Sequence, residues 1–387
     1  MPFKSQNAQI SAILGGRVRA TTRTSLPAEI VGSMDIPSTG SQTDSRALER
    51  SNEAITLGDV PVPADSDDAP GGSASPVSPL GRGLMMAGLP VLLTVNDPVL
   101  AAGVAELFHQ MPDHAGPYAA EFVVDATAPA LPSRDPDEVY ESIQLWRDGD
   151  DLFIDSGGLL QGAATRSRAV IGGARGDGSR GLVALRRMVH HAVAHVLSLN
   201  GELVVHGAAI ARAERAVLLL GPSGAGKSTS AYLASLAGWT LLSDDLVVVR
   251  HVDDGLEAVG VHRSVAVPPE VVAADATQIA LDSRGRRRPP IALDRRPVRI
   301  GAVAIVGHGG EVGAFERISG VEVARFILGA TPAAGHGGVA ADALRAAGVL
   351  GALPCFRLLL PAAANARIAA AGTLFNDLAA VAGWPAE

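Results

Sequence analysis

The stretch GPSGAGKSTSAYLASLAGWTLLSDDLVVV, Gly221–Val249, joins a glycine-rich turn to a helix-like segment and an aspartate pair. Gly221–Ser228 matches the P-loop pattern G-x-x-x-x-G-K-[ST]. A strand-like run, residues 215–220, precedes the turn, and a helical segment that ends at Gly238 follows it. Glycines let successive backbone N–H groups converge on phosphate oxygens, and the helix N-terminus adds partial positive charge. The stretch therefore predicts a phosphate-binding P-loop between a strand and a helix.

The residues of this turn have distinct predicted roles. Lys227 is expected to neutralise the β and γ phosphates of ATP, and Ser228 is expected to bind Mg²⁺. ATP and Mg²⁺ are thus the expected cofactors. The residues predicted to bind the nucleotide are Gly221, Pro222, Ser223, Gly224, Ala225, Gly226, Lys227, Ser228 and Thr229.

The aspartate pair, Asp244 and Asp245, follows Lys227 by 17 and 18 residues in a segment predicted to be one buried strand, residues 240–249. Two charges in an apolar strand are costly unless ions or hydrogen bonds meet them. Adjacent carboxylates can divide the work, with Asp245 holding Mg²⁺ and Asp244 accepting a proton from an attacking hydroxyl. The alternative is that one aspartate only caps a turn.

Residues 204–249, VVHGAAIARAERAVLLLGPSGAGKSTSAYLASLAGWTLLSDDLVVV, resemble the catalytic core of the HPr kinase/phosphorylase family. The resemblance implies an α/β fold with a P-loop kinase core of the HPr kinase and PEP carboxykinase type. It matches His206 to the histidine near the phosphate and metal, and the aspartate pair to the general base or acid. The catalytic residues that it implies are Asp244, Asp245, His206 and Lys227.

The sequence also departs from this family. No counterpart of its second glycine-rich signature, of the type E-x-R-G-x-G, is present, and residues 89–180 look more like the divergent HPr-kinase-related kinases of bacterial peptide-modification clusters. The resemblance implies a kinase that transfers the γ-phosphate to a hydroxyl, on Ser or Thr of a protein or peptide. A small-molecule kinase and a nucleotide-gated regulatory P-loop protein stay open as alternatives, as do phosphorylase activity and the acceptor.

The chain divides into three predicted parts. Residues 1–83 are rich in Ser, Asp, Gly and Pro and predict a disordered tail, with a transit peptide or a natural start at Met85 or Met86 as alternatives. Residues 84–180 predict a small α+β unit, and residues 181–387 predict the P-loop catalytic domain. The predicted elements of the small unit are strands at 89–95, 121–126, 142–146 and 151–157 and a helix from Pro98 with Asp97 as its N-cap.

The segment 181–201 predicts a helix with one apolar face, because Leu182, Leu185, Val189, Val193 and Val196 recur three or four residues apart. His191 and His195 are four residues apart on another side of that helix. Such a pair can bind a metal, but the pattern favours a solvated or interdomain face.

Downstream arginines Arg263, Arg286, Arg287 and Arg288 favour a solvated loop, with a clamp on phosphate or an acidic substrate as the alternative. Residues 354–361 predict a late strand and residues 363–383 a terminal amphipathic helix.

Composition restricts the function classes. A net charge of −8 argues against a nucleic-acid partner, and the single cysteine, Cys355, fits a reducing compartment. No apolar run approaches the roughly 20 residues that span a bilayer, so we expect a cytoplasmic protein with no membrane partner. Whether the chain forms a homo-oligomer stays open.

Overall fold

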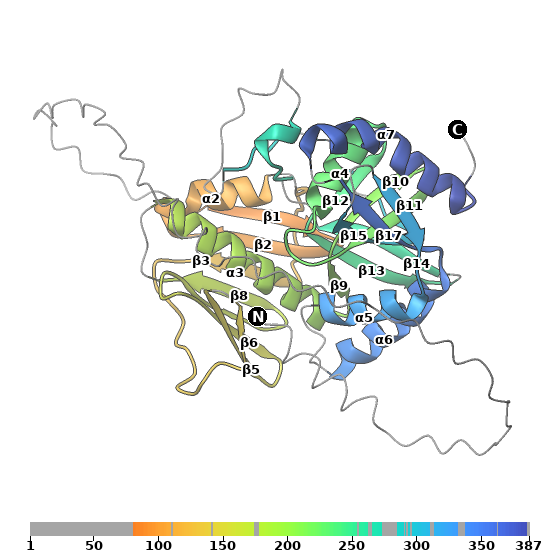
Figure 1. Ribbon diagram of the computed structural model, residues 1–387. Coiled ribbons are helices and arrows are strands. Elements are labelled where there is room, and N and C mark those ends of the chain that lie inside the picture. The colour runs from red at the N-terminus through yellow and green to blue at the C-terminus, as the bar shows by residue number, and fades with distance from the viewer. Residues whose placement is uncertain are drawn as a thin grey trace, which may run out of the picture. The chain divides into compact units, whose positions relative to one another are not determined.

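The computed structural model describes residues 80–109, 111–140, 142–173, 178–253, 255–261, 265–272, 285–289, 291, 293–294, 296–309, 313–331, 337–361 and 363–384. Residues 1–79 of the predicted tail and Arg263 lie outside these ranges. The described residues form a mixed α/β structure with two multi-stranded sheets (Figure 1).

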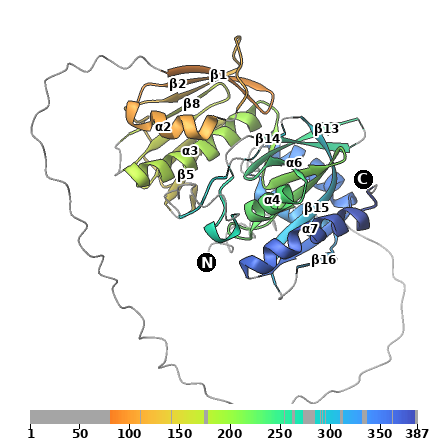
Figure 2. The same cartoon turned by 90° about the horizontal axis from the view of Figure 1, so that it is seen from above.

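The first sheet comes from the N-terminal part of the described chain. Its strands, in spatial order, are β1 (Leu80–Met86), β2 (Leu89–Val95), β3 (Ala120–Val124), β8 (Arg168–Gly172), β7 (Gln161–Ala164), β6 (Asp151–Ser156), β5 (Ile143–Asp148) and β4 (Glu138–Tyr140). The pairs β2–β3 and β3–β8 are parallel, and the other neighbours are antiparallel. Helices α2 (Pro98–Phe108) and α3 (Gly178–Leu199) lie side by side on this sheet (Figure 2).

The predicted small unit is present in this sheet. The Asp97 carboxylate accepts a hydrogen bond of 2.9 Å from the Val99 N–H, and Pro98 is the first residue of α2, which confirms the predicted helix start. β5 and β6 form the predicted antiparallel hairpin.

The first strand begins earlier than the sequence predicted. Residues 80–83, which were assigned to the tail, lie in β1 and pair with β2. Met85 and Met86 are inside β1, not in front of the first strand. The prediction failed because the GRG triplet in this strand resembles loop composition, although β2 supplies its hydrogen-bonding partner.

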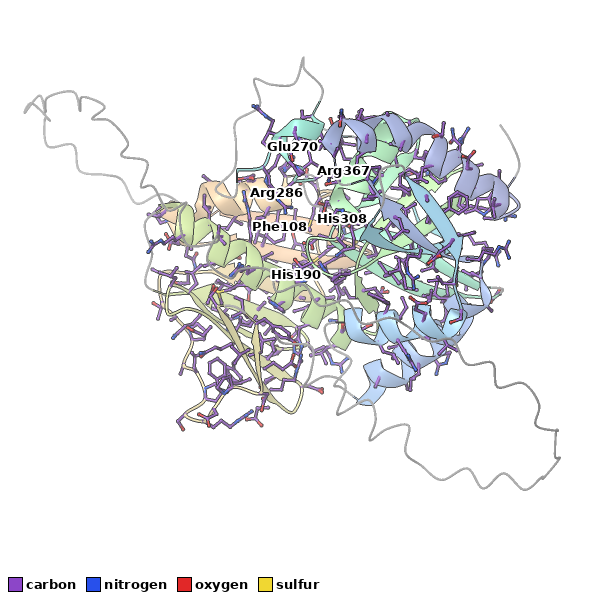
Figure 3. The ribbon with its side chains drawn as sticks, viewed as in Figure 1. Phe108, His190, Glu270, Arg286, His308 and Arg367 are labelled. Atoms are coloured by element: carbon purple, nitrogen blue, oxygen red, sulfur yellow. The ribbon has the colours of Figure 1, made fainter. Side chains whose placement is uncertain are left out.

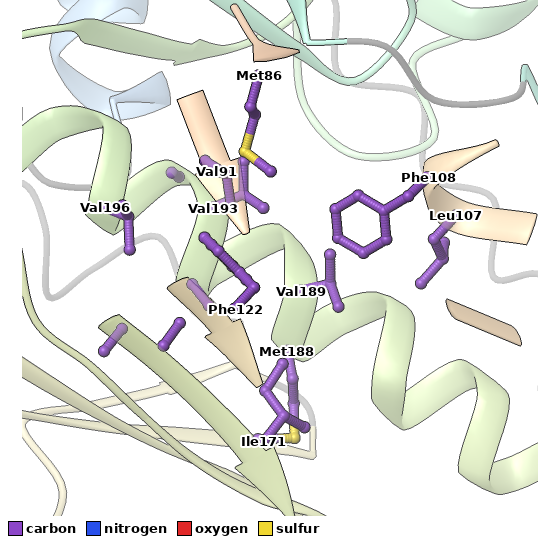
Figure 4. Packing of buried hydrophobic residues seen from close by; sticks show 14 of the residues in the cluster. Met86, Val91, Leu107, Phe108, Phe122, Ile171, Met188, Val189, Val193 and Val196 are labelled. Carbon is purple, nitrogen blue, oxygen red and sulfur yellow. The ribbon is translucent and has the colours of Figure 1, made fainter. Parts of the chain in front are cut away.

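Helix α3 carries its predicted apolar face into a large buried cluster. Leu185, Val189, Val193 and Val196 are each at most 3% exposed. They share this cluster with residues of the first sheet and with Val248 and neighbours from the second sheet, and Figure 4 shows part of the packing around Met188 and Phe122. The predicted domain boundary at residue 180 therefore falls inside α3 and does not separate two hydrophobic cores.

The second sheet holds the rest of the described chain. In spatial order it contains β12 (Thr240–Ser243), β10 (Ala208–Arg212), β11 (Arg215–Leu220), β15 (Val298–His308), β14 (Gly255–Val261), β13 (Leu246–Val252) and β9 (Leu203–His206). β17 (Cys355–Leu360) pairs with the C-terminal part of β15, and β16 (Ala314–Arg317) pairs with β17. β15 is parallel to both β11 and β17.

Helices cover both faces of this sheet. α4 (Lys227–Leu236) and α7 (Ala364–Val381) contact each other, and both belong to one buried cluster. α5 (Gly320–Ala330) and α6 (Gly337–Ala352) belong to the other. The β11 side chains alternate between the two clusters, with Val217 and Leu219 toward α4 and Leu218 and Leu220 toward α5. β17 and α7 confirm the predicted late strand and terminal helix.

Two apolar segments beside the site are each divided, and the sequence predicted the second of them as a single strand. Residues 202–211 form β9 and β10, which separate at Gly207, and residues 240–249 form β12 and β13, which separate at the aspartate pair. β9 pairs with β13, whereas β10 pairs with β11 and β12. The two breaks therefore lie beside each other in the sheet, and the Gly207 N–H donates a hydrogen bond of 3.1 Å to the Asp245 carbonyl.

A second glycine gives a stability prediction. A Cβ at Gly260 of β14 would lie 1.9 Å from the Leu242 carbonyl oxygen, and backbone cannot move aside cheaply. We expect Gly260→Ala to lower the free energy of unfolding by about 3 kcal/mol, the upper end of overpacking costs. Gly348→Ala is the control, because a Cβ there meets no atom within 4 Å, and helix propensity favours alanine by up to about 1 kcal/mol. Urea unfolding midpoints would test both, and an unchanged midpoint for Gly260→Ala would contradict this packing.

Among the described helices, none combines the length and the apolar character needed to cross a membrane.

Candidate phosphate and carboxylate site

The turn Gly221–Gly226 connects β11 to α4, and Lys227 and Ser228 begin the helix, as the sequence predicted. Gly221, Gly224 and Gly226 all have positive φ, at 146°, 82° and 97°, a region that favours glycine. A Cβ at Gly221 would lie 2.7 Å from the Val306 carbonyl oxygen, and one at Gly226 would lie 2.8 Å from Leu360 Cδ1. The backbone course of the turn therefore depends on glycine, for conformation at Gly224 and Gly226 and for both conformation and space at Gly221.

The Lys227 ammonium folds back across this turn. Its Nζ donates hydrogen bonds of 2.9 Å and 3.1 Å to the carbonyls of Gly221 and Pro222. Burial lowers the pKa of Lys227, while the charges of Asp245 and Asp244 act in the opposite direction. The Lys227 ammonium thus lies within the turn, bonded to two carbonyls, and the negative charges of both aspartates stabilise it.

Ser228 connects the start of α4 to the aspartate pair. Its Oγ donates a hydrogen bond of 3.3 Å to the Asp244 carbonyl. The Asp244 residue is 7% exposed, and Thr229, next along the helix, is 5% exposed. The β12–β13 break is therefore at the N-terminus of α4, although β10 separates β12 from β11 in the sheet.

Asp245 meets His206 because of strand register. β9 pairs with β13 so that His206 is opposite Leu246, the residue after Asp245. His206 Nδ1 lies 3.3 Å from Asp245 Oδ1. The histidine and the aspartate that the sequence singled out are thus neighbours, although 39 positions separate them along the chain.

His190 of α3 is the third member of this group, and sequence reasoning missed it. Its Nδ1 lies 3.1 Å from the other Asp245 carboxylate oxygen, Oδ2. Its ring centroid is 5.3 Å from that of His206. Figure 3 labels His190 on α3. The sequence offered one indication of this position, because His190 directly follows Val189 and so lies at the edge of the apolar face of the helix.

The two histidines that the sequence did single out on this helix have other environments. His195 is 2% exposed and its Nε2 lies 2.8 Å from the Asp150 carbonyl, so this position agrees with the interdomain alternative and not with a solvated face. Burial lowers the pKa of His191 to about 3, and its ring centroid is 5.4 Å from that of His190. His191 therefore stays neutral at physiological pH. Neither belongs to the group formed by His190, His206 and Asp245.

His308 also lies at the turn, and the sequence reasoning did not select it. It ends β15, which runs parallel to β11 and therefore reaches the turn at its C-terminal end. His308 Nε2 lies 3.1 Å from the Gly224 carbonyl, and the side chain is exposed (Figure 3). It is placed to support the outer part of the turn.

The arginine cluster has mixed surroundings. The backbone of Arg287 exchanges two hydrogen bonds of 2.9 Å with Val267. Arg288 Nε lies 3.3 Å from a Glu106 carboxylate oxygen, to which Arg186 also donates at 2.6 Å. Arg286 is partly buried. The side chain of Arg288 is thus paired with α2 in place of the predicted solvated loop.

Comparison with known proteins adds little to this geometry. No protein-family model matches the sequence, and no curated protein matches it. Among solved structures, the HPr(Ser) kinase/phosphatase from Coxiella burnetii is similar over 45% of this chain and 94% of its own, with 13% identity and a TM-score of 0.23. A likeness of this size does not decide the function.

Proposed function

We propose that this chain is an ATP- and Mg²⁺-dependent kinase that transfers the γ-phosphate to a hydroxyl, on Ser or Thr of a protein or peptide. The observation that carries the proposal is the contact between Ser228 Oγ and the Asp244 carbonyl. This contact places the aspartate pair next to the glycine-rich turn that holds the buried Lys227 ammonium. A phosphate-binding loop and a proton acceptor are the two parts that phosphoryl transfer to a hydroxyl requires.

The residues of the turn fit a nucleotide. The positive φ angles of Gly221, Gly224 and Gly226 give a backbone course in which successive N–H groups would converge on phosphate oxygens. Lys227 has its ammonium on two carbonyls of the same turn. Phosphate oxygens are stronger acceptors for an ammonium than neutral carbonyls, because they carry charge. Gly221–Thr229 would hold the phosphates, and Ser228 with Asp245 would hold Mg²⁺.

Bound Mg²⁺ would neutralise charge on the phosphates. Residues of this chain would carry out the proton transfer and the positioning. Asp244 is buried beside the start of α4, where its carboxylate would take the proton of the acceptor hydroxyl. His206 Nδ1 lies 3.3 Å from Asp245 Oδ1 and would orient that carboxylate. Lys227 keeps positive charge next to the transferred group.

Labelled ATP tests the reaction class. The full chain would be incubated with γ-labelled ATP, Mg²⁺ and a dialysed bacterial lysate, with the Lys227→Met variant as the matched control. We expect label in a polypeptide with the wild type and none with the variant. Label only in small molecules after adding back the dialysate would favour the small-molecule kinase. ATP binding without any transfer would favour the regulatory P-loop protein.

A further inference from the structure

His190, His206 and Asp245 come from three separate parts of the fold and point their polar atoms at one another. His190 belongs to α3, His206 ends β9, and Asp245 lies at the break between β12 and β13. One potential ligand atom from each lies within 4.8 Å of the other two. The P-loop motif accounts for none of them, and α3 lies outside the stretch that carries that motif.

We propose that His190, His206 and Asp245 form a site for a divalent transition-metal ion of the Co²⁺, Zn²⁺ and Mn²⁺ class. The site binds its ion without nucleotide, and its ligand set differs from that of the Mg²⁺ that accompanies ATP. Asp245 is a ligand in both sites. His190, in contrast, is not needed for any step of the proposed kinase reaction.

The distances agree with a metal shell. Ligands at about 2.1 Å from an ion, with angles of about 90–110°, are about 3.0–3.4 Å apart. The two separations from Asp245 oxygens are 3.1 Å to His190 Nδ1 and 3.3 Å to His206 Nδ1. An ion coordinated by these atoms would take the place of the two direct contacts between the carboxylate and the imidazoles.

The ligand atoms of this group, two imidazole nitrogens and a carboxylate oxygen, favour a transition metal over Mg²⁺. Imidazole nitrogen suits borderline transition metals, whereas Mg²⁺ prefers oxygen ligands and keeps its waters. Two imidazoles and one carboxylate leave coordination positions open for water or a substrate oxygen. The Mg²⁺ proposed at Ser228 therefore does not compete for the histidines.

The surroundings also suit a bound ion. The side chains of His190, His206 and Asp245 are 16%, 35% and 28% exposed, so an ion can reach them from one side. On the other side His190 borders a small apolar cavity, which limits access of water. The cavity is lined by Leu107, Phe108, Met111, Val189, His190, Val193, Leu246 and Val261.

Metal titration of the full chain tests this site. The untagged protein would be stripped with a chelator and titrated with CoCl₂ in the absence of nucleotide, with visible absorption as the readout. Equilibrium dialysis against ZnCl₂ would give the stoichiometry. We expect one tightly bound ion per chain, and no displacement by millimolar Mg²⁺. His190→Asn should weaken binding about 100-fold or more, since loss of even an outer-shell partner costs 10- to 100-fold.

His251→Asn is the matched control, because His251 is an exposed histidine of β13 outside the cluster. It should bind Co²⁺ as the wild type does. Circular dichroism of the metal-free proteins would show whether His190→Asn is folded, and His206→Gln provides a second ligand variant if it is not. Lys227→Met should keep full Co²⁺ binding, so failure of the proposed kinase and failure of the metal site can be told apart. Absence of Co²⁺ binding by the wild type, or equal binding by the ligand variants, would overturn the proposal and leave a hydrogen-bonded cluster.

Discussion

Lys227→Met is expected to weaken MgATP binding by at least about a hundredfold and to abolish phosphate transfer. The Lys227 ammonium is 2.9 Å and 3.1 Å from two carbonyls of the turn, where a phosphate would lie. Removing one partner of a buried charged hydrogen bond typically costs 2–5 kcal/mol, and about 2.7 kcal/mol is a hundredfold in affinity. Isothermal titration with MgATP would measure the affinity, and labelled ATP would measure transfer.

The fold should tolerate this change. Methionine has nearly the length of lysine, and it removes a cation whose burial is unfavourable, as the lowered pKa of Lys227 indicates. We expect a melting temperature close to that of the wild type. Lys227→Arg is the charge-preserving control, and it should not restore activity, because a planar guanidinium does not fit a space shaped for a compact ammonium. Unchanged ATP affinity in a folded Lys227→Met protein would contradict the assignment of the turn.

Asp244→Asn is expected to reduce phosphate transfer by about a hundredfold or more while ATP binding is kept. An amide preserves the size of the side chain but cannot take the proton of the acceptor hydroxyl, and a positioned base contributes about 10²–10⁴-fold. Asp245→Asn should instead weaken nucleotide affinity and alter the Mg²⁺ dependence, since a neutral ligand replaces a carboxylate. Single-turnover transfer and MgATP titration would separate the two effects.

The two aspartates have different environments, which makes this comparison informative. Asp244 is nearly buried, with its carbonyl on Ser228, whereas Asp245 faces two imidazoles. Exchange of the two phenotypes would reverse the roles within the pair without affecting the proposed kinase. Transfer at the wild-type rate by the double variant Asp244→Asn, Asp245→Asn would refute the kinase proposal.

Local pattern predicted the local parts of this site. The strand before Gly221, the helix after it and the left-handed Gly238 that ends that helix all follow from residue type within a few positions. The aspartate pair was recognisable because two charges interrupt an apolar run. These signals depend on neighbours in the sequence, so no knowledge of the tertiary structure was needed.

The non-local parts of the site could not be predicted in the same way. Periodicity gave residues 240–249 as one strand, because leucine and valine lie on both sides of the aspartates. The break arises from pairing with two different partners, β10 before it and β9 after it. His190 was missed for a related reason. Its role depends on which strand faces α3, and helical spacing alone drew attention to His191 and His195.

The buried cluster around α3 has a consequence for how this molecule can be divided. Val204, Leu246, Val248 and their neighbours share that cluster with Leu185 and Val193, and each of these side chains is at most 2% exposed. A fragment that began after the helix would keep the whole P-loop motif but would present a bare apolar sheet face to water. Such a fragment would be prone to aggregate and would lack His190. A chimaera in which another chain replaced the first sheet would fold only if the replacement included a helix whose apolar face matched that of α3. The two sheets therefore form one folding unit.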